Sequence, residues 1–177
     1  MQFIPEEIGS LAQLRHLDVS HSLITNYDEN GSFVDDAFVG IEPLTALTSL
    51  AMHHNYVDNV GFDDAMPRLR CSLRHLDIAC NPCANLPVTP SLQHLTSLRT
   101  SCLPGDLHRM TALAALYIHG HCELHRPYEE HAVPSVTPPP SLQAVYIEDH
   151  DVTKDTMDLI DTFASSVARV VCVDAWR

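Results

Sequence analysis

One short pattern recurs along the chain, and its spacing constrains the fold more than any other feature. The pattern is Leu, two residues, Leu, one residue, an aliphatic residue, two residues, a polar residue, one residue and a second aliphatic residue. Chance placement of leucines in helices does not explain five aligned copies in one short chain. The copies begin at Leu14, Leu47, Leu73, Leu113 and Leu142, and an incomplete copy begins at Leu95.

The Leu-x-aliphatic centre of each copy predicts a short β-strand with both apolar side chains on one side. Leu17 with Val19, and Leu50 with Met52, are examples. We expect the polar residue, Asn55 in the second copy, to satisfy backbone groups in the bend that follows the strand. A single copy cannot bury its apolar face, so the copies must stack into a solenoid with a parallel sheet on one side.

The segments between the strands are irregular. Insertions at 26–40 and 126–140 lengthen two of the intervals, and short helices are expected at 91–95 and 107–112. An amphipathic helix from Thr153, followed by a strand at 170–173, is expected to cap the C-terminal end. The apolar face of that helix carries Met157, Ile160, Phe163 and Val167.

The chain is expected to be one domain, 1–177, with repeats over 1–152 and the cap over 153–177. No polar capping helix precedes the first copy, so its apolar edge is expected to be exposed unless a partner or a further part of a longer protein covers it.

The stretch Ile4-Pro5-Glu6-Glu7-Ile8-Gly9-Ser10-Leu11, followed by Leu14, Leu17 and Val19, resembles intracellular leucine-rich repeat proteins of the Ras-suppressor and plant-related types. The resemblance extends to about Val152. It implies an α/β leucine-rich repeat solenoid with a parallel sheet on the concave face and irregular convex segments. It also implies a protein-binding scaffold whose ligand lies on the concave face, and small members serve as fixed subunits of ciliary motors, spliceosomal particles and phosphatase complexes.

Composition excludes several classes of protein. The formal net charge of −13 argues against a nucleic-acid groove, which needs clustered basic residues. No apolar run approaches the roughly 18 residues of a membrane span. The acidic N-terminus is unlike a signal peptide, and the six scattered cysteines favour reduced thiols. We therefore expect an intracellular, cytoplasmic protein, with cytoskeletal, ciliary and organellar assemblies left open.

Side chains that alternate with the strand aliphatics should lie on the concave face. They mix histidine, carboxylate and tyrosine with one arginine, which is a composition suited to protein recognition, with Tyr and Arg as anchors. An idle solvated face is the alternative. The predicted protein-binding residues are His16, Asp18, His53, His75, Asp77, Arg99, Tyr117, His119, Tyr146 and Glu148.

No metal site is predicted, although 12 histidines occur. His16 and His75 occupy equivalent positions, as do His53 and His119, but neither pair lies in adjacent copies, and metal ligands must converge. The segment from Asn26 to Gly31 resembles half of a calcium loop, but its twelfth position would be Ala37 instead of Glu. A flexible acidic insertion is expected there.

Two further patterns resemble metal or redox motifs. Cys80-Asn-Pro-Cys83 has C-x-x-C spacing, and His119–His125 contains three histidines and a cysteine. Both fit the repeat, because Cys83 fills an inward aliphatic position, Cys80 is expected at the rim, and His121 occupies the polar position. Cysteine packs there as a small apolar residue.

No catalytic set emerges, since the chain lacks a glycine-rich phosphate loop, G-x-S-x-G and a paired-carboxylate motif. We predict a non-enzymatic structural subunit of a larger intracellular complex that binds protein through the concave face and the exposed N-terminal edge. No cofactor, small-molecule substrate, nucleic acid or membrane span is predicted. The alternatives are a transient regulatory adaptor and a metal- or redox-active protein using Cys80, Cys83 and His119–His125.

Overall fold

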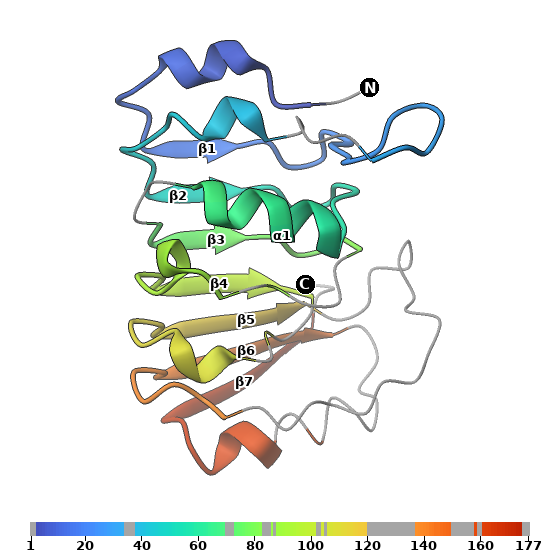
Figure 1. Cartoon of the computed structure of the whole chain (residues 1–177). Helices are drawn as coiled ribbons and strands as arrows, with labels where there is room; N and C mark the ends of the chain where they lie inside the picture. Colours follow the sequence, from blue (N-terminus) through green and yellow to red (C-terminus); the bar gives the residue numbers. More distant parts are fainter. Residues whose placement is uncertain are drawn as a thin grey trace.

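The computed structural model describes residues 3–33, 38–69, 73–82, 86, 88–101, 104, 106–119, 137–149, 158 and 161–174. These residues form an α/β structure around one seven-stranded, all-parallel sheet (Figure 1). The order of the strands in the sheet follows their order in the chain, so each connection returns the chain to start the next strand beside the last. The strands are β1 (His16–Asp18), β2 (Ser49–Ala51), β3 (His75–Asp77), β4 (Ser97–Thr100), β5 (Ala115–His119), β6 (Ala144–Asp149) and β7 (Arg169–Asp174).

The strand register confirms the predicted alignment of the second leucines. Leu17 pairs with Leu50, which pairs with Leu76, and the row continues without a shift to β7. The inward residue two positions after each of these is buried from the second copy to the sixth, and all of these residues but Thr100 are apolar. The first row is Leu17, Leu50, Leu76, Leu98, Leu116, Val145 and Val170, and the second includes Met52, Ile78, Thr100, Ile118 and Ile147.

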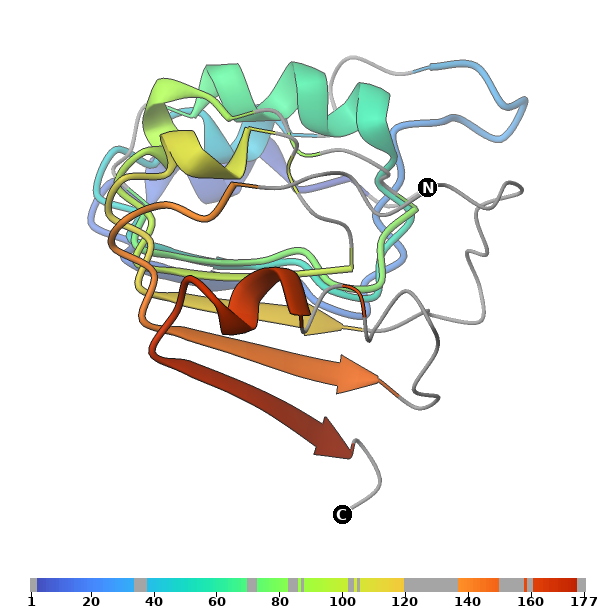
Figure 2. The same ribbon diagram turned by 90° about the horizontal axis from the view of Figure 1, so that it is seen from below.

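Helical segments cover this apolar face from one side (Figure 2). Helix α1 (Asn59–Arg68) was not predicted; it buries Phe62 and Met66, which are four residues apart and so share a helical face. The other segments are short 3₁₀ helices: η1 (Glu6–Ser10), η2 (Val39–Ile41), η3 (Pro90–Leu92) and η4 (Leu107–Arg109). No helix in the described part of the chain is long and apolar enough to cross a bilayer.

The helices predicted at 91–95 and 107–112 are single 3₁₀ turns instead. The reason is the spacing of their buried residues: Leu92 and Leu95 are three residues apart, as are Leu107 and Met110. A 3₁₀ helix has three residues per turn, so one short turn places both side chains of each pair on the core.

The C-terminal cap is described in part. Residues 158 and 161–164 are helical, Phe163 is buried as predicted, and the predicted final strand is present as β7. Met157 and Ile160 lie outside the described residues.

Buried asparagines hold the bends after β2 and β3, as predicted. Asn55 accepts hydrogen bonds from the backbone N–H groups of Ser22 (3.1 Å) and Ile24 (2.8 Å) with Oδ1, and donates from Nδ2 to the carbonyls of Val19 and Met52. Each amide therefore joins its own bend to the bend of the preceding copy. Asn81 forms the corresponding bonds to Val57, Met52 and Ile78.

The insertion after the first bend is tied to the start of α1. Asn26 is buried and exchanges two hydrogen bonds with Asp58, the residue that caps the helix. Oδ1 of Asp28 accepts the backbone N–H groups of Asn30 and Ser32, so this carboxylate closes a turn. Ala37 lies outside the described residues.

Candidate interaction surface on the open face of the sheet

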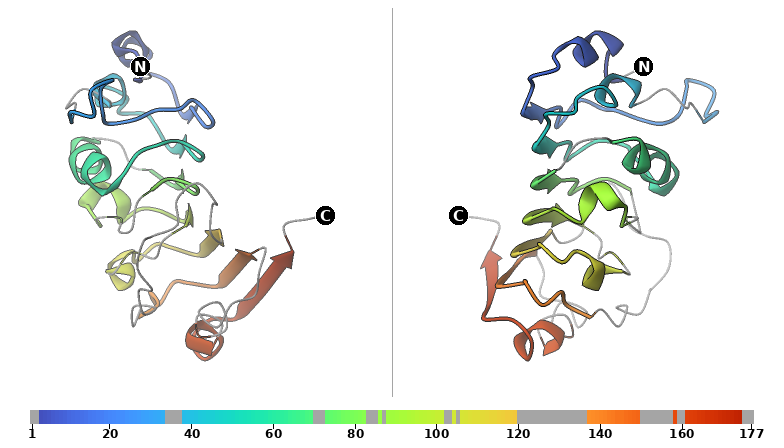
Figure 3. Two further views of the ribbon diagram at one scale, coloured as in Figure 1. Left: turned by 90° about the vertical axis from the view of Figure 1, so that its right-hand side faces the viewer. Right: turned by 60° about the vertical axis from the view of Figure 1, so that its left-hand side comes forward.

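The face of the sheet opposite the helices carries the side chains that alternate with the buried rows. We call it the open sheet face, because no helix in the described ranges lies on it (Figure 3). Nine of the ten residues predicted to bind protein lie in β1–β6, and His53 lies two residues after the end of β2. His16, Asp18 and His75 are exposed, and the other seven are half-buried. Ala79, two residues after Asp77 and so on the same side of the chain by alternation, is buried.

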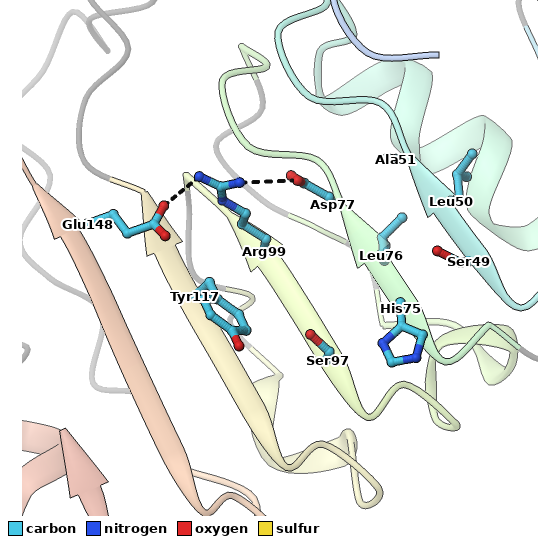
Figure 4. Close-up of a pocket in the computed structure, with 10 residues that line it drawn as sticks. All are labelled: Ser49, Leu50, Ala51, His75, Leu76, Asp77, Ser97, Arg99, Tyr117 and Glu148. Atoms are coloured by element: carbon cyan, nitrogen blue, oxygen red, sulfur yellow. Dashed lines mark hydrogen bonds and ion pairs between the residues drawn. The ribbon is translucent and has the colours of Figure 1, made fainter. Parts of the chain in front are cut away.

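Five of the ten predicted residues meet in one open pocket of about 310 Å³ (Figure 4). Its floor is formed by the central strands, and its upper edge is formed by charged side chains that lie close together. Small residues of β2 and β4 leave the space that the larger side chains surround. The lining residues are Ser49, Leu50, Ala51, His75, Leu76, Asp77, Ser97, Arg99, Tyr117 and Glu148.

Arg99 joins the charged groups of the pocket. Its Nη2 donates to Oε2 of Glu148 at 2.6 Å, and its Nη1 lies 3.6 Å from Oδ2 of Asp77. These contacts extend from β3 to β6, across two intervening strands. Burial raises the pKa of the Asp77 carboxyl, and Glu148 adds to this, while Ala79, His53 and Arg99 oppose it. Nε of Arg99 is buried with no hydrogen-bond partner among the described residues.

Two tyrosines form a flat aromatic surface beside this group. Tyr117 and Tyr146 are opposite each other in the register of β5 and β6, and their rings stack at 4.5 Å with an interplanar angle of 8°. The guanidinium of Arg169 lies 5.9 Å from the ring centroid of Tyr146. The sequence prediction missed Arg169, because the predicted last strand began one residue later, at 170; in the structure Arg169 begins β7 and pairs with Ala144.

His53 lies beside two histidines that the sequence prediction did not select. The side chains of His21, His53 and His54, which we call the histidine cluster, each offer a nitrogen within 4.8 Å of the others. Both missed residues follow a strand leucine by four positions, His21 after Leu17 and His54 after Leu50. This spacing is the signal that could have identified them.

The bend conformation explains how the cluster forms. His21 and His54 have φ values of +54° and +55°, in the left-handed region, so their rings leave equivalent bends in the same direction and stack at 4.3 Å. Burial lowers the pKa of His54, and the neighbouring His21 and His53 lower it further. The hydrogen bond from Ser20 lowers the pKa of Asp18, and His53 and His21 contribute to that shift.

Cys80 occupies the same bend position in the third copy, with φ of +54°. It is buried, so the prediction that it lies at the rim is wrong; its backbone N–H donates to Oγ of Ser101. Its Sγ lies 3.6 Å from Nδ1 of His119, which in turn lies 6.4 Å from the ring of His54. Cys83 and residues 120–125 lie outside the described residues.

The remaining predicted histidines stay apart. Ser49 separates His16 from His75 in the register of β1, β2 and β3.

Comparison of the chain with protein-family models and with curated proteins finds no match.

Proposed function

We propose that the chain is a leucine-rich repeat solenoid that binds a protein partner on its concave sheet face and catalyses no reaction. Support comes from the unshifted row of strand leucines and from the asparagines that join successive bends. Both features are expected where neighbouring copies of one pattern stack on each other. In this reading the open sheet face is the concave face.

The observation that carries the proposal is the composition of the open sheet face around Arg99. Tyrosine and arginine are enriched among the residues that dominate the binding energy of protein interfaces, and tyrosine supplies a large contact area with little loss of conformational freedom. Here the stacked rings of Tyr117 and Tyr146 lie beside an arginine that two carboxylates hold in place. Such anchors are ordered before a partner arrives, which lowers the entropy cost of binding.

The pocket fits one side chain of a partner better than a metabolite. Its volume of about 310 Å³ is at the lower limit for small-molecule sites, and it is open to solvent, whereas those sites enclose most of the ligand surface. The charged groups Asp77 and Glu148, together with the chain's net charge of −13, favour a partner with basic residues. We place the protein in a larger intracellular assembly as a structural subunit.

Affinity purification from the native source tests this proposal. The bait variants are Arg99→Ala with Tyr117→Ala on the open sheet face, and Arg109→Ala as the matched control. Arg109 is an exposed, ion-paired arginine in η4, on the helical side. A specific partner should bind the wild type and the control and should be lost from the double variant. Equal recovery on all three baits would contradict the proposal.

A salt series separates the structural subunit from the transient adaptor. A subunit should keep its partner in stoichiometric amount as ionic strength rises, because a large apolar contact is insensitive to screening. An adaptor held mainly by charge should lose its partner. Circular dichroism of each variant controls for unfolding.

A further inference from the structure

We propose that the histidine cluster is a transition-metal site, with His21, His53 and His54 as the protein ligands of a zinc ion. This site is separate from the pocket around Arg99 and does not depend on the proposed function. Zinc is bound by neutral imidazole nitrogens at about 2.0–2.1 Å, and three protein ligands with one open position form a common coordination set.

The distances within the cluster suit one ion. Two nitrogens bound to the same zinc in a tetrahedron are about 3.3 Å apart. Nδ1 of His53 and Nδ1 of His54 are 3.1 Å apart, and ligand nitrogens of all three residues lie within 4.8 Å of one another. The third ligand, His21, is exposed, so a small rotation of its ring can complete the set.

The backbone conformation of two bends and one buried asparagine place these ligands. His53 lies two residues after the end of β2, while His21 and His54 occupy equivalent left-handed positions in the first two bends. The bends are joined by Asn55, whose amide bonds to backbone groups of both. The separation of the ligands is therefore set by the sheet spacing and by a buried amide, which is the kind of rigid support a metal site needs.

The charges around the cluster favour a cation. Asp18 is close enough to interact electrostatically with His53 and His21, and Asp77 interacts with His53. Arg99 is the nearby positive group that affects His54, but Glu148 and Asp77 already pair with it. Imidazole ligands bind zinc, copper and nickel, so zinc must be tested against copper.

The test uses the full chain without a histidine tag and with all bound metal first removed by a chelator. Isothermal titration with zinc should give one site per chain in the wild type. His21→Ala removes an exposed ligand, and His54→Asn keeps a residue that tolerates the left-handed region. Each substitution should weaken zinc binding by at least roughly tenfold. Removing a residue that only supports a metal ligand already costs about 10–100-fold in affinity, and these substitutions remove the ligand itself.

Two matched controls remove histidines outside the cluster. His75→Ala lies on the same face and His108→Ala on the helical side, and both side chains are exposed. Binding to both controls should equal that of the wild type. In addition, zinc should raise the melting temperature of the wild type and of both controls, and should have little effect on His21→Ala, because a ligand that binds only the folded state stabilises it.

The proposal is overturned if zinc fails to bind near one equivalent per chain, or if His21→Ala and His54→Asn bind as tightly as the controls. Tight one-to-one binding of copper with no binding of zinc would overturn the choice of metal. The absorption spectrum of the Co²⁺ form adds an independent measure, since a four-coordinate site absorbs visible light far more strongly than hydrated Co²⁺. A spectrum of hydrated Co²⁺ alone would contradict the site.

Discussion

The guanidinium of Arg99 in β4 donates a hydrogen bond from Nη2 to Oε2 of Glu148 in β6, at 2.6 Å, across the intervening strand. Its other terminal nitrogen faces Asp77 on the opposite side. One side chain therefore connects three strands, β3, β4 and β6, on the face that we propose as the binding surface.

Arg99→Ala should lower the free energy of unfolding by about 1–2 kcal/mol. The Arg99 and Glu148 side chains are 37% and 20% exposed, so the pair lies between a surface ion pair and a buried one. Arg109→Ala breaks the pair with Asp106, whose side chains are 51% and 56% exposed, and should cost below about 1 kcal/mol. Urea denaturation of both variants measures the difference; equal losses would contradict the bridging role of Arg99.

Asp77 should make stability depend on pH. Burial raises its pKa above the ordinary value of 3.8, so the folded state keeps this proton at a pH where the unfolded chain has released it. The resulting stabilisation is fully present below pH 3.8 and is lost as the pH rises through the raised pKa. The stability of the wild type relative to Asp77→Asn should therefore fall as the pH increases over that interval, measured by denaturation at several pH values. If this relative stability rose with pH instead, the raised pKa of Asp77 would be refuted.

Asn55→Ala should be among the most destabilising substitutions. It leaves two N–H groups and two carbonyls of adjacent bends without their partner, and each buried unsatisfied group costs about 1–3 kcal/mol. We expect a loss of at least about 3 kcal/mol. Asn30→Ala changes an exposed residue and should stay within about 0.5 kcal/mol. Similar melting temperatures for both variants would show that the amide does not join the bends.

The Tyr27 hydroxyl should ionise at a higher pH than that of an ordinary tyrosine. Its hydroxyl donates to Oδ2 of Asp58 at 2.6 Å, and this bond raises the pKa of Tyr27 above 10.0. Stability from the bond is present below pH 10.0 and is lost as the pH rises through the raised value. The ultraviolet titration of the wild type minus that of Tyr27→Phe should show one late-titrating phenol.

Asp58→Asn supplies the control for that titration. It keeps a residue suited to capping α1 but removes the charge that holds the Tyr27 proton. When the difference titration is repeated with Asp58→Asn in both proteins, the pKa of Tyr27 should move down toward the ordinary value of 10.0. An unchanged curve would mean that Asp58 is not the cause.

The sequence predicted the strands well because their signal is local and repeated. Leu50, Leu76 and Leu98 mark strand centres by spacing alone, and the structure places them opposite one another. Helix α1 was missed because its segment carries an internal proline and a weak apolar pattern, and Asp58 and Asn26 stabilise its start through contacts between separate copies. Contacts between residues of separate copies cannot be recognised from the spacing within one copy.

The residues of the candidate site also fall into two groups, those that strand alternation predicts and those that it does not. Alternation along the strands was sufficient to place Arg99, Tyr117 and Glu148 on one face. The histidine cluster depends on φ values in the bends, where His21 and His54 adopt a conformation that no strand pattern encodes. The contact between His119 and Cys80, which crosses β4, likewise depends on side-chain conformation and not on position in the repeat.

Hydroxyl-radical footprinting of the chain, alone and in the complex recovered from its native source, tests the central claim most directly. If a protein partner occupies the open sheet face, oxidation of Tyr117, Tyr146 and His75 falls in the complex, while that of His108 in η4 and His94 beside η3 stays unchanged. Protection of His108 and His94 with no change at the two tyrosines would place the partner on the helical side and contradict the account.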